Sequence, residues 1–116
     1  MLQIEPTGRL SMDVSGNFNL DDMKKAAGKA SALMKTLGHQ GRLMILCQLA
    51  TGEKSVGELS RLLGIAQSPL SQHLSRMRSE GLVMPRRNAQ TVYYSLNSDE
   101  AGRIIECIYE LYCANS

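Results

Sequence analysis

The sequence predicts a mostly α-helical domain that carries one β-hairpin. Apolar residues keep helical spacing from Leu20 to about Gly81, in stretches separated by glycines. Between Leu82 and Leu96 the spacing changes to two, which is typical of strands, and helical spacing then returns. With 116 residues, 43% of them hydrophobic and 21% charged, the chain fits a single domain with a modest core.

Composition and cysteine usage exclude several classes of protein. No apolar run approaches the roughly 18 residues that span a bilayer, and the N-terminus lacks the basic-then-apolar pattern of a secretory signal. We therefore expect a cytoplasmic protein, in which cysteines stay reduced unless they have a redox or metal role. Three cysteines cannot all pair within one chain, so a disulfide scaffold is not favoured.

The N-terminal part divides into an arm and a first helix. Residues 1–19 contain Pro6, Gly8 and Gly16 without a clear period, and they predict a flexible arm before a domain over 20–116. A first helix is predicted from Leu20. Asp21 and Asp22 suit the positive end of a helix at its start, and Gly38 is a typical stop at its end. Its apolar residues recur at steps of four and three, a narrow seam that suits packing on another helix: Met23, Ala27, Ala30, Met34 and Leu37.

A second helix is predicted from about His39 to Ala50, where "TGEK" breaks it. Its apolar positions at i, i+3, i+4 and i+7 predict a buried stripe that includes a cysteine: Leu43, Leu46, Cys47 and Ala50.

Two short helices follow. The first opens with a capping box of Ser55 and Glu58 and ends at Gly64. Three residues later the second begins, with Ser68 as N-cap and Pro69 as first helical residue, and it ends at Gly81. Its predicted buried stripe is Leu70, Leu74 and Met77.

The hairpin and a last helix complete the domain. Residues 83–87 and 91–96 predict two strands with "NAQ" at the tip, and Pro85 marks an edge strand. Asn97 and Glu100 resemble another capping box, after which Ile104, Ile108 and Leu111 keep helical spacing. Two helices joined by a short turn and followed by a hairpin predict a winged helix-turn-helix with five helices in all.

Charge and polar side chains on the fourth helix and the wing indicate DNA binding. Residues 66–90 hold four arginines against one glutamate, whereas residues 97–116 carry a net charge of −3. Side chains of these types hydrogen-bond base edges and phosphates. The predicted DNA contacts are Gln67, Ser68, Ser71, Gln72, His73, Arg76, Arg86, Arg87 and Gln90. The alternative is a winged helix that binds only proteins.

Residues 23–113 resemble the ArsR/SmtB repressors, most specifically in "SQHLSRMRSEGLV" followed by a basic hairpin and "YYSL". The resemblance implies a homodimer in which the first and last helices form the interface. It also implies a repressor that binds a palindromic double-stranded operator and is released by an inducer.

Many members of that family sense metals. The segment that corresponds to their thiolate site is "SVGEL", which has no cysteine, and the last helix contains no histidine. The histidines, His39 and His73, suit structural or DNA-contact roles better than metal ligation. We therefore predict no metal site and no cofactor, although a metal- or metalloid-responsive repressor stays the second candidate.

The cysteines match another subgroup of the family. "ILCQL" on the second helix and "YELYC" near the chain end resemble the reactive-sulfur and redox sensors. The resemblance implies that Cys47 and Cys113 form the sensing pair, and that oxidation or bridging by reactive sulfur species lowers operator affinity. Cys107 shares the apolar stripe of the last helix, which favours packing. For Cys47 alone, a role as a small buried hydrophobe is the competing interpretation.

An enzyme is not predicted. The sequence shows no Cys-x-x-Cys motif, glycine-rich phosphate loop or carboxylate pair at catalytic spacing. His39 and Cys47 lie about two turns apart on one helix, too far for a hydrogen-bonded base and nucleophile.

Overall fold

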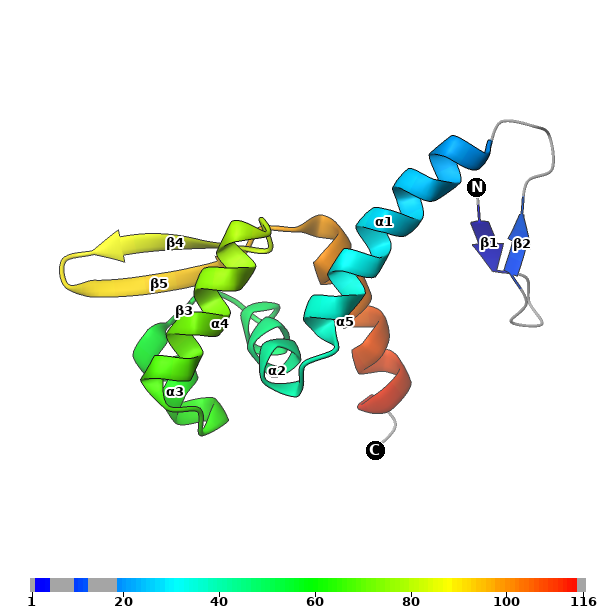
Figure 1. The fold of residues 1–116 in the computed structure, drawn as a ribbon. Helices are drawn as coiled ribbons and strands as arrows, with labels where there is room; N and C mark the ends of the chain where they lie inside the picture. The colour runs from blue at the N-terminus through cyan, green and yellow to red at the C-terminus, as the bar shows by residue number, and fades with distance from the viewer. Residues whose placement is uncertain (1, 5–9, 13–18, 115–116) are drawn as a thin grey trace. The chain divides into compact units, whose positions relative to one another are not determined.

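The structure, a computed structural model, describes residues 2–4, 10–12 and 19–114. The chain divides into two compact units, residues 1–34 and 35–116. In the first unit, β1 (Leu2–Ile4) pairs antiparallel with β2 (Leu10–Met12), and α1 (Leu20–Leu37) begins (Figure 1). These strands were not expected within the arm. Residues 1, 5–9 and 13–18 of that arm lie outside the described residues, so its flexibility and its boundary at 19 stay predictions.

The second unit is a helical domain with a hairpin (Figure 1). Its helices are α2 (Gln40–Leu49), α3 (Val56–Leu63), α4 (Gln67–Ser79) and α5 (Asp99–Tyr112). A short β3 (Lys54–Ser55) joins the hairpin of β4 (Val83–Asn88) and β5 (Thr91–Leu96), in the order β3-β5-β4. The predicted fold class is confirmed. Pro85 lies on the edge strand β4, where a residue without an N–H removes no ladder hydrogen bond from a central strand.

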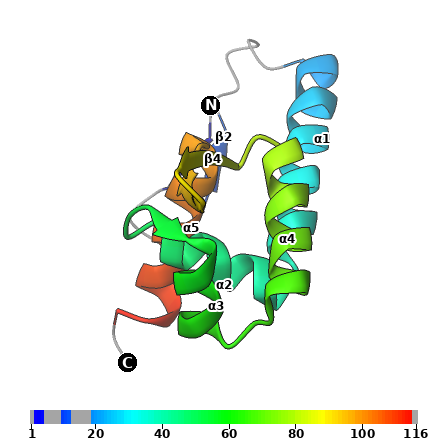
Figure 2. The ribbon, with the colours of Figure 1, turned by 90° about the vertical axis from the view of Figure 1, so that its left-hand side faces the viewer.

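Helix α2 is the centre of this unit, because it contacts α3, α4, α5 and β5 (Figure 2). The predicted stripe of α4 is fully buried, with Leu70, Leu74 and Met77 at most 1% exposed. The rest of the core is aliphatic: Leu37, Ile45, Leu46, Leu49, Leu59, Leu82, Val83, Ala101 and Ile105. No helix in the described part of the chain is long and apolar enough to cross a membrane.

The buried stripe predicted for α2 was wrong in part. Leu46 is buried, but Ile45 and Leu49 are its buried companions, whereas Cys47 is half-buried and Ala50 is exposed. The reason is that neighbours cover α2 on several sides, so its buried side chains do not form a single helical stripe.

Two predicted helix starts need correction. Helix α4 begins at Gln67 with Ala66 as N-cap and without a side-chain cap, so Pro69 is its third residue. A proline is tolerated there because the first four N–H groups of a helix have no intrahelical acceptor. The N-cap of α5 is Ser98 and not Asn97: the Ala101 N–H donates to the Ser98 hydroxyl at 3.1 Å.

Helix α5 presents two different faces. Ala101 and Ile105 are buried in the core of the unit. The predicted stripe lies to one side of them: Ile104 and Ile108 are half-buried, and Leu111 is 70% exposed. An apolar stripe is therefore left uncovered by the described chain.

Candidate DNA-binding surface and thiol site

Helix α3 is closed at both ends by local structure. The Ser55 N–H donates to the Glu58 carboxylate and the Glu58 N–H to the Ser55 hydroxyl, both at 3.1 Å, which confirms the predicted capping box. These bonds from Ser55, first of all the one from its N–H, lower the pKa of Glu58. At the other end, Gly64 has φ +65°, and the Ser60 hydroxyl donates to the Ile65 carbonyl at 2.7 Å. This geometry fixes the start of α4 relative to α3.

One face of α4 consists of exposed polar side chains. Those predicted to contact DNA and found exposed are Gln67, Ser68, Ser71, Gln72 and Arg76. The Arg76 guanidinium lies 3.8 Å from the Glu80 carboxylate one turn later, a loose ion pair that leaves it able to reach a phosphate. Of these exposed side chains, Ser68, Gln72 and Arg76 recur at steps of four and lie opposite the buried stripe, so their side of α4 is free to enter a groove.

His73 differs from the other predicted contacts. It is half-buried on the side of α4 that faces the start of α2, and its ring centroid lies 4.6 Å from that of His39. His39 is the N-cap of α2, and its Nδ1 accepts the Gly41 N–H at 3.1 Å. Burial, followed by the charges of His39, Arg42 and Arg76, lowers the pKa of His73. His73 thus joins α4 to α2, and its contact with DNA stays a prediction.

The wing holds its two arginines differently. Arg86 makes a bidentate ion pair with Glu53, at 2.7 and 2.9 Å, and its guanidinium lies 4.8 Å from the Tyr93 ring centroid. The pairing raises the pKa of Arg86 and lowers that of Glu53. Arg87 and Gln90 are exposed at and near the tip, where Ala89 takes a left-handed φ of 57° to close the turn. Of the predicted wing contacts, Arg86 alone is already neutralised.

The sequence did not predict two pairings at this surface: that of Glu53 with Arg86 and that of His39 with His73. Glu53 lies 33 positions before Arg86, so no local spacing connects the two. His39 sits at the entry to α2 and meets α4 only through the fold. Neither pairing left a signal in the sequence.

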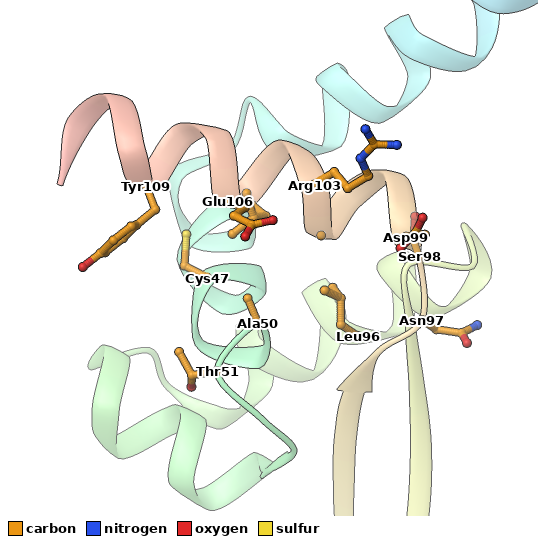
Figure 3. A pocket seen from close by; sticks show the side chains of 12 residues that line it. Cys47, Ala50, Thr51, Leu96, Asn97, Ser98, Asp99, Arg103, Glu106 and Tyr109 are labelled. Atoms are coloured by element: carbon orange, nitrogen blue, oxygen red, sulfur yellow. The ribbon is translucent and has the colours of Figure 1, made fainter. Parts of the chain in front are cut away.

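Cys47 opens on a cavity between α2 and α5 (Figure 3). The cavity has a volume of about 760 Å³, and its walls include Leu96, Ile105 and Tyr109. The sulfur of Cys47 points from α2 toward α5. Burial raises the pKa of the Cys47 thiol, and the charge of Cys113 raises it further. An interaction of this kind requires nearby charges, since screening weakens it beyond about 10 Å.

Cys113 and Cys107 lie on different sides of α5. Gly102, Glu106, Tyr109 and Cys113 recur at steps of four, three and four, so they share a helical face, and the first three line the cavity of Cys47. Cys113 is the C-cap residue of α5 and is exposed. Cys107 is exposed beside the apolar stripe of Ile104, Ile108 and Leu111. Cys113 thus continues the face of α5 that lines the cavity of Cys47, whereas Cys107 lies on another side, and the pairing of Cys47 with Cys113 stays a prediction.

Comparison with known proteins identifies the family. Residues 39–84 match the model of bacterial regulatory proteins of the arsR family. The transcriptional activator HlyU of Vibrio cholerae is 50% identical over 83% of this chain and 89% of its own length. The chain belongs to the ArsR family. The biofilm growth-associated repressor of Agrobacterium fabrum, 46% identical over 85% of both chains, is a second ArsR-family relative.

The structure agrees with this membership of the ArsR family. It superposes on reduced HlyU from Vibrio cholerae with a TM-score of 0.78 and 49% identity, covering 81% of this chain and 99% of that one. ArsR-family proteins are DNA-binding transcriptional regulators and not enzymes. Within the described ranges, no group of three or more histidine, cysteine, aspartate or glutamate side chains is arranged to hold a metal ion.

Proposed function

We propose that this ArsR-family regulator binds a palindromic operator as a homodimer, and that its operator affinity falls when Cys47 and Cys113 are oxidised or joined by sulfur. The observation that carries the proposal is that the Cys47 sulfur opens on a cavity whose α5 wall continues to Cys113, and that the charge of Cys113 acts on the pKa of Cys47.

The polar face of α4 supports the operator contact. Gln72 suits the edge of an adenine, and Arg76 suits a guanine or a phosphate. The exposed Arg87 and Gln90 of the wing would follow the neighbouring groove.

Uncovered apolar residues support the dimer. The stripe of α5 ends in Leu111, which is 70% exposed, and α1 carries exposed Met23 and Met34. Apolar patches of this kind usually mark protein contacts. A two-fold dimer would present two α4 helices about one DNA turn apart, as a palindromic site requires.

The two thiols differ in a way that suggests an order of reaction. Cys113 is exposed and open to reagents, whereas the raised pKa of Cys47 keeps its thiol protonated at neutral pH. Because Cys113 is the more accessible thiol, it attacks first and Cys47 second.

With an organic persulfide as reagent, the chemistry needs no further oxidant. The Cys113 thiolate attacks the outer, sulfane sulfur, so that a new S–S bond forms and the thiol of the reagent leaves. The Cys47 thiolate then attacks the Cys113 sulfur, a disulfide forms, and hydrosulfide leaves. The two cysteines lose two electrons, and the persulfide gains them in becoming a thiol and hydrogen sulfide.

A bridge at this place would act on α4 through α2. It would pull α2 toward α5, and α2 contacts α4 both through the core and through the His39–His73 ring contact. A shift of α2 would thus change how α4 is held, and a shift of α5 would move the dimer interface. Either movement changes the separation of the two α4 helices across the operator.

Operator binding before and after persulfide treatment tests the proposal. Wild type should lose affinity and regain it when a dithiol reductant is added. Cys47→Ser and Cys113→Ser should keep their affinity after treatment, and Cys107→Ser should respond as wild type does. A full response in both of the first two variants contradicts the proposal, and a response to metal ions alone supports a metal-responsive repressor instead.

A further inference from the structure

A small cavity lies between α4 and the wing, away from the thiols. It has a volume of about 380 Å³ and is lined by Arg78, Pro85, Arg87, Val92 and Tyr94. Arg78 comes from the last turn of α4, and the other four come from the hairpin. None of the lining side chains is acidic, so the cavity suits an anion.

Strand register explains why the hairpin residues gather there. Pro85 is opposite Tyr94 and Arg87 is opposite Val92, and alternate residues of a strand share one face. Arg86 falls between Pro85 and Arg87, on the other face, opposite Tyr93. The pleat therefore separates the two neighbouring arginines of the wing.

The arginines near the cavity also differ in whether an acidic side chain neutralises them. Arg86 is neutralised by Glu53, at 2.7 and 2.9 Å. Within the described chain, the guanidinium groups of Arg78 and Arg87 form no ion pair and no hydrogen bond. Two guanidinium groups without an acid partner thus face one cavity, together with the ring of Tyr94. Guanidinium forks match the geometry of phosphate oxygens, and a phenol can donate one further hydrogen bond.

The position of the cavity, between α4 and the wing, indicates that its ligand is a phosphate of the DNA backbone. When a recognition helix lies in a major groove and the wing follows the neighbouring minor groove, the DNA strand that separates the two grooves runs between helix and wing. We propose that Arg78, Arg87 and Tyr94 form a clamp for one phosphodiester of that strand. Arg78 and Tyr94 are new members of the DNA-binding surface, and Arg86 is not a member of the clamp. The inference rests on the proposed placement of α4 and the wing on DNA.

The salt dependence of DNA binding reports the number of phosphates that the protein contacts. Each phosphate contact contributes about 0.9 to the slope of log affinity against log salt concentration. Each substitution changes both protomers, so Arg78→Gln and Arg87→Gln should each reduce the slope by up to one contact in each half-site. Each should weaken binding to operator and to unrelated DNA alike, by about tenfold per half-site, as loss of a charged hydrogen bond predicts. Tyr94→Phe should weaken binding without changing the slope, because it removes no charge. Arg103→Gln, on α5 and outside the helix-turn-helix and wing, removes the same charge; it is the matched control and should leave the slope unchanged.

A modified operator identifies the phosphate itself. Neutral methylphosphonate replaces one backbone phosphate at a time. Wild type should lose affinity when one particular position in each half-site is replaced, and Arg78→Gln should show no loss at that position. Inorganic phosphate serves as a separate probe: an anion site without a DNA role would bind it while Arg78→Gln binds DNA as wild type does, and that result overturns the clamp. If wild type shows no salt-dependent binding to DNA at all, the proposed DNA-binding function fails first. If wild type binds and Arg78→Gln has an unchanged slope, the clamp alone is wrong.

The variant Arg78→Lys distinguishes loss of the phosphate contact from loss of folding. It keeps the charge and loses the fork, so its slope should equal that of wild type while its affinity falls between those of wild type and Arg78→Gln. Equal affinities for Arg78→Lys and Arg78→Gln, together with equal slopes, would contradict a phosphate contact.

Discussion

The Cys47 thiol on α2 opens on a cavity whose α5 wall continues to Cys113; burial raises the pKa of Cys47, and the charge of Cys113 raises it further. This cavity lies between the helix at the centre of the core and the helix that bears the uncovered apolar stripe. A covalent change there would reach both α4 and the proposed dimer interface.

The first prediction concerns the reactivity of the thiols. Because burial and the charge of Cys113 raise the pKa of Cys47, we expect Cys113 to be alkylated faster than Cys47 at neutral pH. Cys113→Ser should lower the pKa of Cys47 by removing the nearby charge, and Cys107→Ser should leave it unchanged. Alkylation rates measured against pH by peptide mass spectrometry check this. An unchanged Cys47 profile in Cys113→Ser would mean that the two sulfurs do not interact.

The second prediction concerns the polar face of α4. Gln72→Ala should weaken operator binding by about ten- to a hundredfold, as the loss of one base contact predicts, with little effect on unrelated DNA. Arg76→Ala should weaken operator binding without changing the unfolding temperature. Arg103→Ala, on α5 and outside the helix-turn-helix and wing, is the matched control for loss of a positive charge. Fluorescence anisotropy measures the affinities, and unchanged affinity in both variants would show that another face reads the operator.

The third prediction concerns Glu53. Glu53→Gln removes the carboxylate that neutralises Arg86, so that guanidinium becomes available to DNA. We expect tighter binding to any DNA sequence and a steeper salt dependence, by up to one contact in each half-site of the dimer. Glu110→Gln, an exposed acid on α5, removes the same charge outside the helix-turn-helix and wing and should have a much smaller effect. Weaker binding by Glu53→Gln would instead mean that the ion pair holds the wing in its DNA-binding position.

The fourth prediction concerns pH. The pKa of His73 is lowered, and burial is the main cause. The imidazole of His73 therefore binds a proton more readily in the unfolded chain than in the folded one. The free energy of unfolding should therefore fall as the pH drops below about 6.5, the ordinary value for histidine. His73→Gln should show a shallower loss over that range in denaturant titrations. Parallel curves for the two proteins would rule out this role of His73.

Local signals in the sequence predicted most of the fold. The capping box of Ser55 and Glu58, the stop at Gly64 and the change of period after Leu82 each depend on neighbouring residues, and each is found in the structure. The start of α4 was misplaced because Ser68 and Pro69 also suit the first turn, where neither has to cap the helix.

Relationships that depend on the tertiary fold could not be predicted. Glu53 and Arg86, or Arg78 and Arg87, meet only because the hairpin folds back beside α3 and α4. The half-buried state of Cys47 depends on four neighbouring elements around α2, and helical spacing reports on one face only. The pairing of Cys47 with Cys113 came from resemblance alone and stays a prediction.

The most direct test of the thiol account is the identity of the covalent product. Reduced protein is treated with an organic persulfide until operator binding is lost, and its peptides are then mapped without reduction. We predict a linked pair of peptides that contain Cys47 and Cys113, joined directly or through added sulfur atoms, formed in step with the loss of operator binding. Loss of operator binding with both of these thiols unmodified, or with a bridge that involves Cys107 instead, would contradict the account.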